Sequence, residues 1–227
     1  MTPTIRLWDL PTRLFHWLLV FAVVGAVVTM KLGGSWMAWH ERFGLLVVGL
    51  LSFRIVWGII GSTYARFGTF VRGPSAIMAY FRGQWRGVGH NPLGALSVLA
   101  LIGLFGFQAA TGLFANDDIA FDGPLVPLVS SDWSDILSGW HRETEWYLYA
   151  LAALHVLAVL FYTYIKKDNL LRPMVTGYKP VKKKQAVDAK GGGWLAFVVA
   201  VAIAVGVVWL ANGGLVPPPP PTRDLGW

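Results

Sequence analysis

One apolar run, residues 140–167, is long enough to cross a bilayer as a helix, and it carries two histidines, His141 and His155. Ionisable side chains inside a membrane helix are costly, so they mark a functional site. His155 follows His141 by about 14 positions, which at roughly 100° and 1.5 Å per residue places both rings on one face, about 21 Å apart along the axis. We therefore predict a helix that serves two cofactors at two depths of a membrane, each needing a second ligand from another helix.

Four other apolar runs, residues 14–30, 39–60, 92–114 and 194–210, are predicted to be membrane helices as well. A chain that is 55% hydrophobic and 14% charged, with a mean hydropathy of +0.54, agrees with an integral membrane protein. We predict an all-α membrane protein, in which a four-helix transmembrane bundle binds the cofactors and a fifth, C-terminal transmembrane helix faces lipid at its periphery. The expected units are the core at 1–180, a basic and glycine-rich linker at 181–193, the extra helix at 194–212 and a proline-rich tail at 213–227.

The net charge of +7 comes from basic segments beside the apolar runs, so nucleic acid is not an expected partner. The lead at 6–13, the connector at 62–89 and the segment at 166–184 all fall on one side if five helices alternate. An excess of lysine and arginine marks the cytoplasmic side of a membrane protein. The expected location is the bacterial inner membrane, with a cytoplasmic N-terminus and a periplasmic C-terminus.

The chain has no cysteine, which excludes disulfides, iron–sulfur clusters and covalently attached c-type haem. His16 falls at the inner end of the first predicted helix, level with His155, and His40 falls at the outer end of the second, level with His141. Neutral imidazoles that face each other across a bundle are ligands for b-type haem, so we predict two bis-histidine haem b sites. A single histidine at a helix end is more often an interfacial polar residue, but four at two depths are hard to obtain by accident.

Glycines and arginines near these histidines also fit a haem pocket. Small residues leave room for a flat ligand, although ordinary helix packing explains them equally well, and the candidates are Gly25, Gly44 and Gly49. Arg54 lies about 14 positions after His40, deep in the membrane on the same face, and it needs an anion. A haem propionate is the preferred candidate over backbone carbonyls or snorkelling, whereas Arg13 and Arg142 are weaker propionate candidates that also fit interfacial anchoring.

Several short strings in this order resemble the b-type cytochrome subunit of nickel–iron hydrogenases and the related bacterial cytochrome b561 group: RLFHW at 13–17, WHERFG at 39–44, GHNP at 89–92, WHR at 140–142 and TGY at 176–178. The resemblance covers about residues 5–180. It implies a four-helix diheme core that passes electrons between a quinone and a partner redox protein, with His16, His40, His141 and His155 as the ligands. The fifth helix and the proline tail depart from the family core.

His90 and Asn91 precede the third predicted helix at its inner end. In the wider family the corresponding segment lies near the inner haem, where a quinone can bind. A quinone needs hydrogen-bonding groups at its carbonyls and a proton route on reduction, which histidine and asparagine supply. The alternative interpretation is a polar helix N-terminus in water.

The expected function is therefore that of a membrane diheme cytochrome b, an electron-transfer subunit rather than an enzyme with catalytic residues of its own, that links the quinone pool to a periplasmic redox partner. That partner is a cytochrome c, a dehydrogenase or a hydrogenase subunit with basic residues around its cofactor, because the outer loop at 116–135 is acidic. The proline tail, ending in Leu225-Gly-Trp, is expected to tether it. One alternative is a stand-alone cytochrome b561 that oxidises a small species such as superoxide with quinone as acceptor. The other is a non-redox membrane anchor, which would be colourless when purified.

Overall fold

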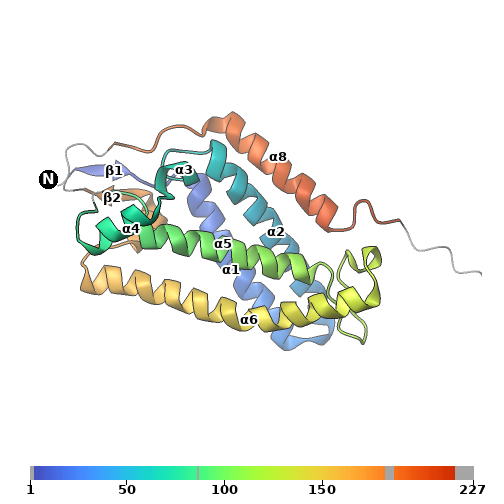
Figure 1. Ribbon diagram of the computed structural model, residues 1–227. Helices are drawn as coiled ribbons and strands as arrows, with labels where there is room; N and C mark the ends of the chain where they lie inside the picture. The colour runs from blue at the N-terminus through green and yellow to red at the C-terminus, as the bar shows by residue number, and fades with distance from the viewer. Residues whose placement is uncertain (1–2, 86, 182–186, 218–227) are drawn as a thin grey trace, which may run out of the picture.

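The computed structural model describes residues 3–85, 87–181 and 187–217. Parts of the charge and tether predictions fall outside the described residues. These parts are Arg86, the lysines at 182–184 and the tail from residue 218 onward. Within the described ranges, five helices are long and apolar enough to cross a membrane, which confirms the predicted all-α membrane architecture. They are α1 (Leu10–Leu32), α2 (Met37–Ile60), α5 (Pro92–Gly112), α6 (Ser131–Leu160) and α8 (Gly193–Ala211) (Figure 1).

Side-chain caps explain where three of these helices begin. The Asp9 carboxylate accepts from Thr12 N at 2.8 Å ahead of α1, and Asn91 Oδ1 accepts from Gly94 N at 2.7 Å ahead of α5. Ser130 caps α6, with Asp132 in the first turn. The helix therefore begins at Ser131 rather than at residue 140, since a polar cap and first turn start it well before its apolar stretch. A π-helical turn, η3 (Phe161–Ile165), continues α6.

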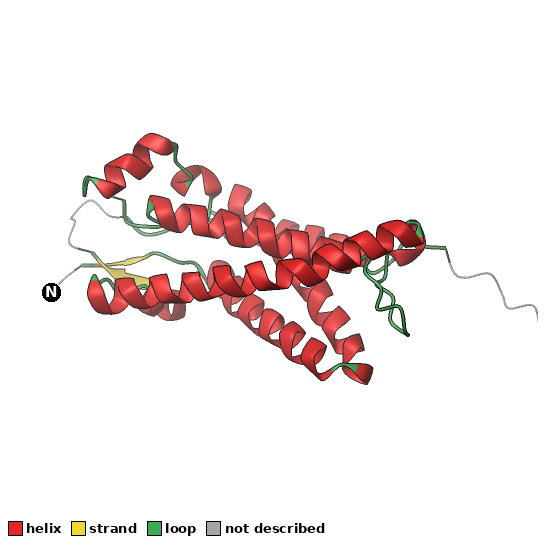
Figure 2. Cartoon of the chain, turned by 60° about the horizontal axis from the view of Figure 1, so that its bottom comes forward, coloured by secondary structure: helices red, strands yellow, loops and turns green. Residues whose placement is uncertain are grey.

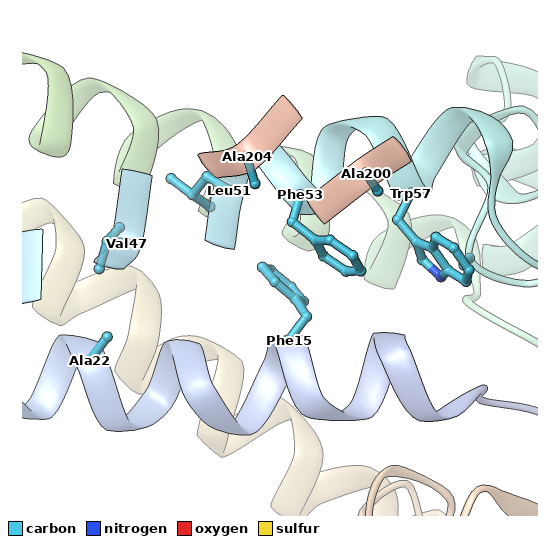
Figure 3. Packing of buried hydrophobic residues seen from close by; sticks show 9 residues of the cluster. Phe15, Ala22, Val47, Leu51, Phe53, Trp57, Ala200 and Ala204 are labelled. Carbon is cyan, nitrogen blue, oxygen red and sulfur yellow. The ribbon is translucent and has the colours of Figure 1, made fainter. Parts of the chain in front are cut away.

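Helix α2 is the centre of the bundle. Helices α1, α5 and α8 all pack against it, and α5 packs along α6 (Figure 1). Figure 2 shows the two short strands at one end of the long helices. The buried core lies at the junction of α1, α2 and α8, where aromatic residues of the first two meet alanines of the third (Figure 3); its labelled members are Phe15, Ala22, Val47, Leu51, Phe53, Trp57, Ala200 and Ala204.

Helix α8 lies at the edge of the bundle, as predicted, but one of its faces is buried against α2. Ala200, Ala204 and Ala211 are the buried residues of that face, and many of the other apolar side chains of α8 are exposed. Small side chains allow the two backbones to approach closely. A Cβ on Gly49 of α2 would lie 2.8 Å from Val208 Cγ2, so Gly49 makes room for α8 rather than for a flat ligand.

Short elements cover the two ends of the bundle. At one end lie the antiparallel strands β1 (Thr4–Arg6) and β2 (Tyr178–Pro180) with the helices α3 (Phe67–Phe70), α4 (Pro74–Phe81) and α7 (Leu171–Thr176), so the connector predicted at 62–89 contains two helices. We call this end the strand pole. The opposite end, the loop pole, carries η1 (Gly34–Trp36) and the 113–130 loop with η2 (Val126–Leu128).

Candidate functional site

The structure brings the four membrane histidines together in the two predicted pairs. His16 of α1 and His155 of α6 form the strand-side pair, with ring centres 6.5 Å apart. His40 of α2 and His141 of α6 form the loop-side pair, with ring centres 6.0 Å apart. Two imidazoles that bind one first-row metal ion from opposite sides, each nitrogen about 2.0–2.1 Å from the metal, place their ring centres roughly 6.3 Å apart. Each pair therefore has the spacing that a shared metal ion requires.

The number of donors indicates what kind of metal group fits. Within the described residues, no cluster of three or more histidine, cysteine, aspartate or glutamate side chains could form a metal cage. A pair of imidazoles suits an ion whose remaining ligands come from elsewhere, as the iron of a haem takes them from its porphyrin. The donor sets of both pairs therefore fit b-type haem better than a bare metal ion.

Backbone carbonyls orient the rings of the loop-side pair. Nδ1 of His40 lies 2.8 Å from the Ala26 carbonyl oxygen, and Nδ1 of His141 lies 2.9 Å from that of Gln108. A carbonyl oxygen only accepts, so in the neutral form of each ring Nδ1 carries the proton and Nε2 carries the lone pair that would bind a metal. This is the arrangement in which a hydrogen bond on one nitrogen fixes the tautomer and orientation of a histidine ligand. For His141, the Gln108 amide nitrogen lies 3.4 Å from Nε2.

A pocket lies beside the rings of the loop-side pair. It is lined by both histidines together with Gly44, Gly112 and residues of α5 and the 113–130 loop. A Cβ on Gly112 would lie 2.7 Å from Cε1 of His141, so only glycine lets that ring lie so close to α5. A Cβ on Gly44 would meet no atom within 4 Å, and its task of leaving space for a flat ligand stays a prediction. A Cβ on Gly25, in contrast, would lie 2.5 Å from Cζ of Phe43, so Gly25 makes room for that ring and serves helix packing.

Gln108 connects α5 to the loop-side pair, and the sequence analysis did not single it out. Its amide nitrogen donates to the His141 carbonyl oxygen at 2.9 Å, and the Thr144 hydroxyl donates to its amide oxygen. A polar amide within an apolar run was a visible signal, but its partners depend on how α5 and α6 pack. Close by, Lys31 of α1 forms a 3.0 Å ion pair with Glu145 of α6, one turn after His141.

The strand-side pair contains a buried ring nitrogen without a partner. Nδ1 of His16 is inaccessible and has no hydrogen bond within the part of the chain that the structure describes. The same is true of one guanidinium nitrogen of Arg54, a residue that is only 3% exposed and lies over the Phe67 ring at 4.6 Å. Unpaired buried polar groups are costly, so each of these two atoms has a hydrogen bond left for a ligand, and that of Arg54 suits an acidic group.

Two charged side chains at the start of α1, Asp9 and Arg13, have partners of their own. The buried Asp9 carboxylate, whose charge acts on Arg54, accepts from Trp57 Nε1 at 3.0 Å as well as capping α1. Arg13 donates to the Val175 carbonyl oxygen of α7 at 2.6 Å. Only Nη1 takes part in this bond, and the Nε of Arg13 is buried without a partner within the described residues, so its propionate role stays a prediction. Arg142 is exposed.

His90 and Asn91 belong to a polar group at the strand pole. The His90 ring packs between Trp8 and Phe70, with ring centres 4.7 and 4.5 Å away, and its Nδ1 is buried. Burial, followed by the charges of Arg54 and His155, lowers the pKa of His90 to about 3, so the ring is neutral at cellular pH.

Asn91 uses both ends of its amide. While its oxygen caps α5, its nitrogen donates to the Tyr162 hydroxyl at 2.9 Å, and the Tyr162 and Tyr80 hydroxyls share a further hydrogen bond. Tyr162 lies in the π-helical turn η3, a feature found frequently at functional sites. Asn91 thus serves as the predicted helix start and also links α5 to two tyrosines that the sequence analysis missed.

Comparison with known proteins places most of the chain in one family. The family model described as prokaryotic cytochrome b561 matches residues 7–177. The chain is 25% identical to the probable Ni/Fe-hydrogenase B-type cytochrome subunit of Azotobacter vinelandii, over 78% of this chain and 89% of that protein. It is 23% identical to a probable Ni/Fe-hydrogenase 1 B-type cytochrome subunit of Escherichia coli (strain K12), over 77% and 90% of the two chains. No solved structure gives a significant match.

Proposed function

Because the chain belongs to the prokaryotic cytochrome b561 family, we propose that it is a diheme membrane cytochrome b that carries electrons between a quinone and a redox partner. His16 and His155 would hold one haem b, and His40 and His141 the other. The observation that carries this proposal is the spacing of the two pairs, 6.5 and 6.0 Å between ring centres, on a helix that contributes one histidine to each. A haem held by two imidazoles supplies one-electron transfer.

The residues around each pair have different tasks in this proposal. At the loop-side pair, the carbonyls of Ala26 and Gln108 hold the rings, Gly112 leaves room for the His141 ring, and Gly44 would leave room for the porphyrin. At the strand-side pair, Arg54 offers an unpaired guanidinium nitrogen to a propionate. The loop-side assignment is supported by a pocket that both of its histidines line, and the strand-side assignment by the ring spacing and the unpaired atoms.

We propose that the quinone binds near the strand-side pair, beside Asn91 and Tyr162. Reduction of a quinone to a quinol takes up two electrons and two protons, so its site needs hydrogen-bonding groups and a supply of protons. The Asn91 amide, the two tyrosine hydroxyls and the neutral His90 ring supply such groups at the end of the bundle. The basic residues of this pole support its placement on the cytoplasmic side of an inner membrane.

The partner is proposed to dock at the loop pole, on the periplasmic side. Curated relatives carry names that make them subunits of Ni/Fe-hydrogenases, which supports a hydrogenase as the partner, with a dehydrogenase or a cytochrome c as the other redox proteins of suitable kind. The acidic loop beside the loop-side pair suits a partner whose docking surface is basic.

The two-haem assignment is tested by haem counting in single variants. We expect purified wild-type protein to contain two haem b groups per chain in a pyridine haemochrome assay. His40→Ala and His155→Ala should each lose one of them, because each removes one axial bond. His90→Ala is the matched control and should keep both. One haem per wild-type chain, or loss of haem from His90→Ala with retention in His40→Ala, would contradict the assignment, and a colourless protein would favour a membrane anchor.

A further inference from the structure

The C-terminal segment lies beyond the region that the family model matches, which ends at residue 177. We infer that residues 187–211 form part of the strand-side haem site, where they shield the group of Arg54, Asp9 and Trp57 from water and thereby set the reduction potential of that haem. This inference rests on the proposed strand-side haem site, and it assigns to α8 a task beyond crossing the membrane.

The segment before α8 is bonded to the strand pole rather than running free. Ala189 N donates to the Arg6 carbonyl oxygen at 2.7 Å, and Thr63 N donates to that of Lys190 at 2.8 Å. The Tyr64 hydroxyl donates to the Val187 carbonyl oxygen at 2.8 Å. These bonds join residues more than a hundred positions apart in the sequence, and they hold the start of α8 at one place on the bundle.

Three glycines then bring the chain against Trp57. Gly191, Gly192 and Gly193 have φ angles of 84°, 81° and 61°, a region that other residues rarely adopt. A Cβ on Gly192 would lie 2.8 Å from the Trp57 ring, whereas one on Gly193 would meet nothing within 4 Å. Gly192 is therefore needed for contact with Trp57 as well as for its backbone angle.

Phe197 of α8 covers the other side of the same tryptophan. Its ring centre lies 6.3 Å from that of Trp57 and 5.9 Å from that of Phe53, which stacks on Trp57 (Figure 3 shows the latter two). Trp57 is 2% exposed as a result, and its indole N–H donates to the buried Asp9 carboxylate. Arg54 lies one turn before Trp57 on α2 and against the Phe67 ring. Helix α8 therefore covers the tryptophan that bonds to Asp9 and lies beside Arg54 along the helix.

The charge of Arg54 also acts on His90. It is one of the causes of the low pKa of His90, after burial, in the same region of the bundle. Charges interact more strongly where water is excluded. A positive charge held near a haem opposes the extra positive charge of its oxidised form and raises its reduction potential. Water that reached Arg54 would weaken this effect, so a gap between α8 and α2 should lower the potential of the strand-side haem.

The loop-side haem provides an internal reference. His40 and Arg54 are about 14 residues apart on α2, a rise of about 21 Å, so the loop-side pair lies far from the group that α8 covers. A change confined to that group should therefore move the potential of one haem and leave the other in place. A general loss of stability would alter both haems or the haem content.

The test is a redox titration of the full-length protein with its haems bound, followed at the α-band of each haem. In Phe197→Ala and in Gly192→Ala we expect the potential of the strand-side haem to fall and that of the loop-side haem to stay unchanged. Leu195→Ala, which shortens a side chain that is 66% exposed, and Gly193→Ala, which strains a similar backbone without touching Trp57, should leave both potentials as in wild type.

Hydrogen exchange gives a second readout that does not depend on the haems. The α2 peptide around Trp57 should exchange faster in Phe197→Ala and Gly192→Ala than in the two controls, and this comparison also holds for a variant that accumulates poorly. Unchanged potentials in both test variants, or equal shifts at both haems, would overturn the inference. A wild-type protein with a single haem would instead refute the proposed function, before any variant is compared.

Discussion

Gly112 illustrates at the residue scale how one missing side chain allows the loop-side pair to form. The His141 ring lies against the α5 backbone at this position, where its Nδ1 reaches the Gln108 carbonyl oxygen. Any Cβ at residue 112 would lie closer to the ring than real contacts allow, and the ring would have to turn. Turning the ring would break the hydrogen bond that keeps its proton on Nδ1. Nε2 would then no longer be fixed as the nitrogen whose lone pair can bind a metal.

We therefore expect Gly112→Ala to lose the loop-side haem and to lower the haem content from two towards one per chain. Gly139→Ala is the control, because residue 139 lies about 200° from His141 around α6 and a Cβ there meets nothing within 4 Å. Both changes put alanine for glycine in a helix, which by itself is stabilising by about 1 kcal/mol. Haem content is measured by the pyridine assay. Equal haem content in Gly112→Ala and Gly139→Ala would contradict this account.

At the scale of elements, α6 and its π-helical turn connect the membrane histidines to the strand pole. His155 lies about two turns before Tyr162, so the two side chains leave nearby faces of one helix. The π-turn carries Tyr162 to the Asn91 amide and the Tyr80 hydroxyl, while Tyr164 of the same turn is 64% exposed. Within this one short turn, Tyr162 is hydrogen-bonded inside the bundle and Tyr164 points outward.

If Tyr162 serves the proposed quinone site, Tyr162→Phe should slow reduction of an added quinone several-fold, because it removes a hydroxyl that binds the carbonyl or passes a proton. Haem content and the spectra of both haems should be unchanged. Tyr164→Phe removes the same group from the exposed position and should behave as wild type. Equal quinone reduction rates in the two variants, measured in membranes with an artificial electron donor, would argue against this site.

The whole molecule is electrically asymmetric. The strand pole carries arginines and lysines, among them Arg66, Arg72, Arg82, Lys166, Lys167 and Arg172, and the loop pole carries Asp117, Asp118, Asp122, Asp132 and Asp135. Not all of these aspartates are free to meet a partner. The backbone N–H groups of Phe121, Ala120 and Ile119 donate to Asp117 and lower its pKa, so this carboxylate holds the loop together.

Docking of a basic partner is therefore best tested with Asp118→Asn and Asp122→Asn, which leave Asp117 in place. Asparagine also tolerates the left-handed backbone of residue 118, whose φ is 58°. We expect electron transfer to the partner to slow and to lose part of its dependence on ionic strength, because salt screens charges beyond roughly 8–10 Å. If the electron-transfer rate changes neither with salt nor with the two substitutions, docking does not depend on the charges of Asp118 and Asp122.

The sequence alone determined what depends on local periodicity and on the membrane. Apolar run lengths predicted five spans, and the 14-residue interval between His141 and His155 predicted two sites at two depths. Both depend only on spacing along one helix, which needs no knowledge of its neighbours. The pairing of His16 with His155 and of His40 with His141 followed from depth in the bilayer.

Only the tertiary structure decided which surfaces meet. Gly25 and Gly49 accommodate Phe43 and Val208, Arg13 finds a carbonyl of α7, and Gly192 brings α8 onto Trp57, none of which spacing could predict. A glycine or an arginine looks the same in sequence whether it faces a ligand, a helix or lipid. Its role is settled by contacts between segments far apart in the chain, and these arise when the helices pack against one another.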